Sequence, residues 1–94
     1  MKRLMFGELP FHINPARLTQ FEVIAESDGI AVVTFYGDHG TIAEYAYTPK
    51  DPQRQVTSQE VTKLEKSILI ALNDPTASEF TIHLPESEGT WGLH

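Results

Sequence analysis

The chain has 94 residues, and its 13 Asp and Glu residues against 7 Lys and Arg residues give a net charge of −6. A chain of this length forms one domain with one core, so we expect residues 1–94 to fold together. The negative charge argues against direct nucleic-acid binding, which requires cations that displace counterions from phosphates, and against docking on an anionic membrane. The lack of cysteine excludes disulfides, Cys-ligated zinc and thiol catalysis.

The lack of cysteine also favours a cytoplasmic location, because secreted domains of this size usually depend on disulfides. After Lys2 and Arg3, only three apolar residues precede Gly7 and Glu8, which is too short a run for a signal peptide. No stretch approaches the ~20 apolar residues of a transmembrane helix. We therefore expect a cytoplasmic protein that does not interact with membranes.

The first part of the chain predicts a short strand followed by an irregular segment. Residues 3–6 form the candidate strand, and Pro10, Asn14 and Pro15 then interrupt regular structure. Residues 7–18 are expected to be an ordered loop, or to contain one helical turn that begins with Asn14 as the cap and Pro15 at the first helical position.

The middle of the chain predicts an antiparallel β-meander. Two β-prone runs, 21–27 and 30–36, flank Asp28-Gly29, a dipeptide typical of two-residue hairpin turns. A second turn at residues 37–40 leads into a third strand over 41–48. A two-residue first turn predicts that Glu26 pairs with Ala31, Ile24 with Val33, and Glu22 with Phe35. A four-residue second turn predicts that Phe35 pairs with Ile42, Val33 with Glu44, and Val32 with Tyr45.

This register sorts the side chains of the meander onto two faces. The first face is expected to carry Phe21, Val23, Ala25, Ile30, Val32, Thr34, Tyr36, Ala43, Tyr45 and Tyr47. The second face is expected to carry Glu22, Ile24, Glu26, Ala31, Val33, Phe35, Ile42, Glu44 and Ala46. Burial of an unpaired carboxylate costs several kcal/mol, so the first face should meet the core and the second face should contact water.

The C-terminal part predicts one amphipathic helix and one further strand. Thr57 and Glu60 have the spacing of a capping box, apolar residues then recur at helical spacing, and Pro75 prevents continuation, so we expect a helix over 58–73. Leu69 and Ile70 widen its apolar stripe, which suggests that the last turn is covered on more than one side. Residues 79–84 alternate as in a strand, with Phe80, Ile82 and Leu84 pointing one way. Residues 85–94 are expected to be a loosely held tail unless Trp91 docks.

The predicted fold class is therefore α+β. It consists of an antiparallel β-meander, one amphipathic helix packed on one face and a further C-terminal strand, in the order β(β)ββαβ. The strand order stays open, including whether 79–84 pairs in parallel; a parallel pairing with 41–48 would require a right-handed crossover.

The candidates for catalysis and metal binding are weak. No two of the four histidines, His12, His39, His83 and His94, have the spacing of a helical ligand pair. Glu22 and Glu26 lie about 13 Å apart along one strand, too far for paired carboxylate chemistry. There is no nucleophile elbow and no phosphate-binding loop. We expect no enzymatic activity, no metal site and no cofactor.

Charge segregation is the most informative feature of the sequence. Nine of the 13 carboxylates lie in residues 18–49 and 67–94, two stretches that contain no Lys or Arg. A surface built from these stretches has no local counter-charge and favours a basic partner. The second face also places apolar residues inside a ring of glutamates, as protein-binding surfaces do. The candidate protein-binding residues are Glu22, Ile24, Glu26, Val33, Phe35, Ile42 and Glu44, with Phe35 as the anchor.

The first function hypothesis is a small acidic, non-enzymatic protein-binding module that acts on a basic protein surface, such as one that handles nucleic acid. Stoichiometric inhibitors of the phage or mobile-element type are comparable in size and charge. One alternative is a small-ligand-binding or catalytic domain with a pocket between helix and sheet, near Thr34, Tyr45 and Tyr47. Another is a structural subunit of a larger assembly. The protein could be a monomer or a homodimer, and segment 7–18 or the tail could cover the second face instead.

Overall fold

The computed structural model describes residues 1–51, 53–82 and 89–94. These residues form seven strands, one 3₁₀ helix and one α-helix. In chain order the elements are β1 (Lys2–Phe6), β2 (Leu9–Ile13), η1 (Pro15–Arg17), β3 (Gln20–Ala25), β4 (Ala31–Gly37), β5 (Gly40–Pro49), α1 (Ser58–Asn73), β6 (Glu79–Ile82) and β7 (Gly89–Leu93).

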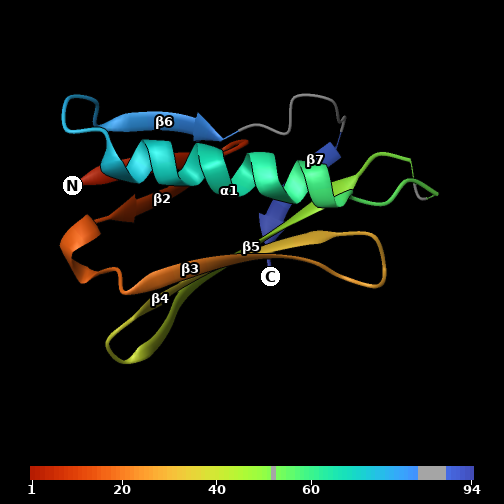
Figure 1. The fold of residues 1–94 in the computed structure, drawn as a ribbon, viewed down its shortest axis with the longest axis horizontal. Helices are drawn as coiled ribbons and strands as arrows, with labels where there is room; N and C mark the ends of the chain where they lie inside the picture. Colours follow the sequence, from red (N-terminus) through yellow and green to blue (C-terminus); the bar gives the residue numbers. More distant parts are fainter. Residues whose placement is uncertain (52, 83–88) are drawn as a thin grey trace.

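The strands form two sheets that face each other across the core, and the α+β class with its β-meander is confirmed. The three-stranded sheet has the order β2-β1-β6, and the four-stranded sheet has the order β3-β4-β5-β7. All pairs are antiparallel except β1 with β6, so the C-terminal strand 79–82 pairs with β1 and not with 41–48. The helix α1 closes one side of the core by contacting β3 and β6 (Figure 1).

The first hairpin has a three-residue turn, which corrects the predicted register. Ala25 pairs with Ala31, the Glu26 amide donates to the Ile30 carbonyl at 2.8 Å, and the Gly29 amide donates to the Glu26 carbonyl at 3.0 Å. Gly29 has a φ of +91°, so it supplies the left-handed residue that follows a tight turn in three-residue hairpin loops. The extra loop residue shifts β4 by one position relative to β3, and a shift of one turns every β4 side chain to the other face.

The second hairpin compensates for this shift with a β-bulge. Gly37 pairs with Gly40 and Tyr36 with Thr41, but Phe35 pairs with Ala43, so Ile42 is the additional residue. As a result β5 keeps its predicted orientation relative to β3, while β4 is inverted relative to both neighbours. The predicted pairings across both hairpins are therefore wrong by one residue in β4.

Two segments expected to be irregular are strands. Residues 9–13 of the predicted loop form β2, and Asn14 then caps η1 as expected, with its side-chain oxygen accepting from the Ala16 amide at 3.1 Å. Residues 89–93 of the predicted tail form β7 beside β5. The Trp91 ring packs against Phe6 and Tyr47, with centroid distances of 5.0 and 5.3 Å, so this part of the tail is docked. Residues 85–88 lie outside the described residues.

The helix has the predicted bounds and the predicted capping box. The Thr57 side chain accepts from the Glu60 amide at 3.2 Å, and the Glu60 carboxylate accepts from the Thr57 amide at 3.2 Å. The Arg54 guanidinium lies 2.8 Å from the same carboxylate oxygen of Glu60, whose side chain is buried. At the other end, Leu69 and Ile70 are 49% and 60% exposed, so the expectation that the last turn is covered on several sides is wrong within this single chain.

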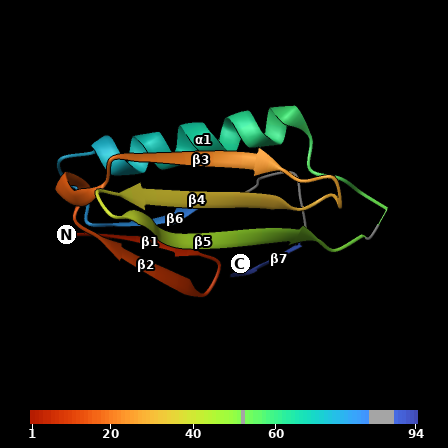
Figure 2. The same ribbon diagram turned by 90° about the horizontal axis from the view of Figure 1, so that it is seen from below.

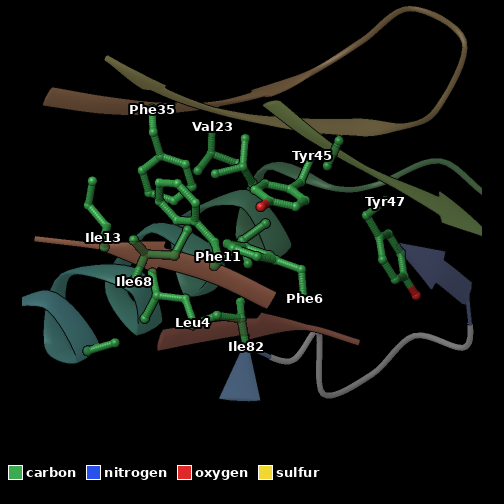
Figure 3. Close-up of a cluster of buried hydrophobic side chains, with 14 of the residues drawn as sticks. Leu4, Phe6, Phe11, Ile13, Val23, Phe35, Tyr45, Tyr47, Ile68 and Ile82 are labelled. Atoms are coloured by element: carbon green, nitrogen blue, oxygen red, sulfur yellow. The ribbon is translucent and has the colours of Figure 1, made fainter. Parts of the chain in front are cut away.

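The core lies between the two sheets and α1 (Figure 3). The buried side chains that fill it are Leu4, Phe6, Phe11, Ile13, Val23, Ala31, Val33, Phe35, Tyr45, Tyr47, Val56, Leu64, Ile68, Ala71 and Ile82. Tyr45 and Tyr47 are buried as predicted, but strands cover them rather than the helix. The Tyr45 ring stacks on Phe6 at 4.5 Å, and the Tyr47 ring meets Trp91 edge-on. β6 alternates as predicted over 79–82, with Ile82 buried, while residues 83–84 lie outside the described residues.

Candidate functional site: the open face of the four-stranded sheet

The four-stranded sheet is built from the two stretches that lack Lys and Arg. β3, β4 and β5 come from residues 18–49, and β7 comes from residues 67–94. The seven Lys and Arg residues of the sequence all lie elsewhere: on β1, on η1, in the connection before α1, and on α1 itself. The strands of this sheet therefore carry carboxylates and no Lys or Arg side chain, which favours a negative field around them.

One side of this sheet is turned away from the core, and we call it the open face. Figure 2 views the sheet from this side, and no described helix or strand crosses in front of β3, β4 or β5. β2 lies in the opposite sheet and β7 extends the open face sideways. Neither the described part of segment 7–18 nor that of the tail therefore covers the open face.

Residues of the open face form rows that run across the strands. Glu22 and Glu44 both pair with Thr34, from opposite sides, so one row reads Glu22, Thr34, Glu44. The next row reads Ile24, Val32, Ala46, Gly92. Ile24 is 45% exposed, whereas Val32 and Thr34, on the central strand β4 with a strand on each side, are only 5% and 6% exposed.

Glu22 is held by a side chain that the predicted register placed on the core face. The Tyr36 hydroxyl donates a hydrogen bond to Glu22 Oε1. This hydrogen bond is the main reason that the pKa of Tyr36 is raised, and the negative charges of Glu22 and Glu44 add to the effect. Tyr36 therefore stays protonated well above neutral pH and remains a donor that orients the Glu22 carboxylate.

Glu44 is held from the other side of the row by the end of the chain. His94 Nδ1 lies 2.8 Å from Glu44 Oε2, and the His94 amide donates to the Glu44 carbonyl at 3.2 Å. β7 places His94 there because Leu93 pairs with Tyr45, the residue after Glu44. The open face therefore carries two oriented carboxylates, one on each side of the buried Thr34.

The structure places only some of the predicted site residues on the open face. Glu22, Ile24 and Glu44 lie on the open face as expected, and Glu26 is exposed at the end of β3. Val33 and Phe35 are fully buried in the core, so their placement on the exposed face is wrong. The cause is the three-residue turn that inverts β4. Phe35 cannot be the anchor of a binding surface, since its ring packs against Phe11 at 4.5 Å.

Ile42 is exposed, but the bulge removes it from the regular alternation of β5. A Cβ atom at Gly37 would lie 3.0 Å from Ile42 Cδ1, so the Ile42 side chain lies beside Gly37 at the end of the hairpin. With Arg17 and the turn residues it lines a surface hollow of about 320 Å³. Of the four apolar residues predicted for the binding surface, only Ile24 is therefore exposed in the regular rows of the open face.

Sequence reasoning missed four members of the open face: Val32, Thr34, Tyr36 and His94. The first three were assigned to the other face because of the one-residue error in β4. Only knowledge that the turn at Asp28-Gly29 has three residues could have corrected this assignment. His94 was hidden because β7 has two glycines and little alternation. The same error predicted a pocket near Thr34, Tyr45 and Tyr47; Thr34 instead faces away from the two tyrosines, on the opposite side of the sheet.

A second exposed apolar area lies at the end of α1. Leu69 and Leu72 line a hollow of about 380 Å³ together with Leu18 and Phe21. Of the residues described, no three His, Asp or Glu side chains come together as a metal site. Within the described part of the chain, every helix is too short or too polar to cross a membrane.

Comparison with known proteins does not assign this chain to a family. No protein-family model matches it, and neither a curated protein nor a solved structure matches it significantly. A functional interpretation must therefore be argued from the open face itself.

Proposed function

We propose that this chain is a small acidic protein-binding module, without enzymatic activity, whose open face binds a basic surface on another protein. The observation that carries this proposal is the four-stranded sheet without Lys or Arg, with Glu22 and Glu44 oriented on its solvent side. Such a surface attracts cationic partners over about one Debye length and repels anionic ones. Ile24 and Tyr36 supply apolar contact area beside the charges.

The partner that we propose is a protein whose basic surface otherwise handles nucleic acid. The module would occupy that surface stoichiometrically, as small acidic inhibitors do. The exposed carboxylates contribute chiefly to the association rate and to the choice of partner, because exposed ion pairs add only about 0.2–1 kcal/mol each. The cytoplasm is the location that we propose for this activity, and the cysteine-free composition supports it.

The proposal is tested by affinity capture from cell extract, followed by mass spectrometry, at low and at high salt. Three baits are compared: the unaltered chain, the double variant Glu22→Gln/Glu44→Gln, and the control Glu65→Gln, which removes an exposed charge from α1. The expected result is a basic protein retained at low salt by the unaltered chain and the control, and lost with the double variant. Equal capture by all three baits, insensitive to salt, would contradict the proposal.

The stoichiometry of the complex is tested with purified components. Light scattering of the chain and of the complex gives both masses, and a module that acts on one basic surface forms a complex of one to one. A labelled oligonucleotide is first bound to the captured protein, and the module is then added. Release of the oligonucleotide shows that the module occupies a surface that handles nucleic acid. Simultaneous binding of the oligonucleotide and the module would contradict that part of the proposal.

A further inference from the structure

We propose that the segment bound by the open face is a basic amphipathic α-helix that lies across the strands, along the row of Glu22, Thr34 and Glu44. This inference rests on the proposed function and specifies the shape of the partner. Three features of the open face support it: the spacing of the two carboxylates, their orientation, and the apolar row beside them.

The spacing of the two carboxylates matches a helix better than an extended chain. Glu22 and Glu44 flank Thr34 on neighbouring strands, so their backbones are two interstrand spacings apart, roughly 9–10 Å. Residues i and i+7 of an α-helix lie on the same side and are separated by about 10.5 Å along its axis. Side chains on one side of an extended chain recur at about 6.8 and 13.5 Å, and neither interval fits.

The orientation of the carboxylates is set before any partner arrives. Tyr36 holds one oxygen of Glu22, and His94 holds one oxygen of Glu44. Among the described residues, neither hydrogen bond uses the second oxygen of its carboxylate, and that oxygen can accept a charge-assisted hydrogen bond from a Lys or Arg side chain. Side chains that are already ordered lose less conformational entropy on binding, so this row is better prepared for two cations than an isolated surface glutamate is.

The neighbouring row offers a shallow, apolar seat for the flank of the helix. Val32 is only 5% exposed, so its neighbours shield most of its side chain. A Cβ atom at Gly92, at the β7 end of this row, would meet nothing within 4 Å. Ile24 projects at the β3 end of this row, where it is 45% exposed. The two rows are about 6.8 Å apart, within the 10–12 Å diameter of a helix. A helix with Arg at i and i+7 therefore presents its residues i+1, i+4 and i+8 to the apolar row.

Binding of labelled peptides tests this geometry. The first peptide is a soluble helix with Arg at i and i+7 and Leu at i+1, i+4 and i+8. The second has the same composition, but the Arg at i+7 is exchanged with the residue at i+5. The third carries the first pattern with two central prolines that prevent helix formation. Fluorescence anisotropy gives the dissociation constants with the unaltered chain and with the variants Glu22→Gln, Glu44→Gln, Ile24→Ser and Glu65→Gln.

The first peptide is expected to bind about fivefold or more tightly than either of the others. Glu22→Gln and Glu44→Gln are each expected to weaken it about threefold to fivefold at low salt, in line with about 1 kcal/mol for an exposed pair. Ile24→Ser is expected to weaken it without changing the salt dependence, and Glu65→Gln to leave it unchanged. Circular dichroism confirms that each variant is folded.

The outcomes separate this inference from the proposed function. Equal affinity for all three peptides, with loss on Glu22→Gln, would overturn the helical partner and leave the acidic binding module standing. Absence of peptide binding while affinity capture succeeds would have the same meaning. Absence of binding in both experiments would overturn both.

Discussion

Substitution of Phe35 by alanine decides whether β4 has the register described above. In that register the Phe35 ring is fully buried, and it contacts the rings of Phe11, Phe6 and Phe21 at centroid distances of 4.5, 6.0 and 6.0 Å. In the register shifted by one residue, the ring would lie on the open face, where its removal would leave no cavity in the core.

The expected loss of stability follows from burial. Transfer of a fully buried Phe side chain to water costs about 2–3 kcal/mol, and the cavity left among rigid aromatic neighbours brings the typical cost of Phe→Ala to about 3–5 kcal/mol. For a chain of this length the total free energy of unfolding is expected to be roughly 5–14 kcal/mol. The matched control Ile24→Ala removes a side chain that is already 45% exposed, so about 1 kcal/mol is expected.

Urea unfolding followed by tryptophan fluorescence measures both effects. Trp91 is the only tryptophan and packs against Phe6 and Tyr47, so its emission reports the core between the sheets. The midpoint and slope of each transition give the free energy of unfolding. A cost for Phe35→Ala of less than about 1 kcal/mol, equal to or below that of Ile24→Ala, would refute the assignment of the open face.

Three further predictions concern the elements around this sheet. Thr57→Ala should lower the free energy of unfolding by about 1 kcal/mol through loss of the helix cap, while Thr62→Ala, on the exposed side of the same helix, should change it by less than about 0.5 kcal/mol in urea titrations. Burial opposes ionisation of Glu60, but its hydrogen bonds from Arg54 and Thr57 outweigh burial and lower its pKa. The contribution of Glu60 to the free energy of unfolding is therefore complete above the unfolded-state pKa of about 4.3 and is lost as the pH falls below that value. Unfolding measured from pH 7 to pH 3 should show this loss in the unaltered chain and a flatter profile in Glu60→Gln; identical profiles would contradict it. Gly89→Ala should destabilise the chain by about 1–3 kcal/mol, because the added Cβ would lie 2.4 Å from the Thr48 carbonyl oxygen. Gly92→Ala should be nearly neutral, because its Cβ would meet nothing within 4 Å. Thermal unfolding compares the two variants, and equal melting temperatures would count against the placement of β7.

Local signals in the sequence predicted the elements that depend on few residues. The helix over 58–73 follows from the capping box of Thr57 and Glu60 and from Pro75, and both ends are as predicted. η1 follows in the same way from Asn14 and Pro15. These signals act between residues a few positions apart, so they can be recognised in the sequence without knowledge of tertiary contacts.

Features that depend on distant contacts escaped prediction. Asp28-Gly29 fits a two-residue turn and a three-residue turn equally well locally, and burial of Val33 and Phe35 selects the latter. The bulge at Ile42 then returned β5 to its predicted orientation, so Glu22 and Glu44 were assigned correctly although their common neighbour was not. β7 carries Trp91, whose ring packs edge-on against Phe6, a contact between residues far apart in the sequence.

The position of β1 in the middle of its sheet has a consequence for synthesis of the protein. β2 follows immediately and forms a local hairpin with β1, but β6, the partner on the other edge, pairs Arg3 with Glu79. Lys2 likewise donates to the carbonyl of Ala77, at 3.1 Å. Leu4 and Phe6, fully buried in the finished fold, therefore cannot be fully covered on the ribosome until β6 has emerged, although Phe35 and Tyr45, which pack against Phe6, emerge earlier. Such long-range closure folds slowly and exposes nascent chains to association, so we expect yield to depend on expression temperature more than on the stability of the folded state.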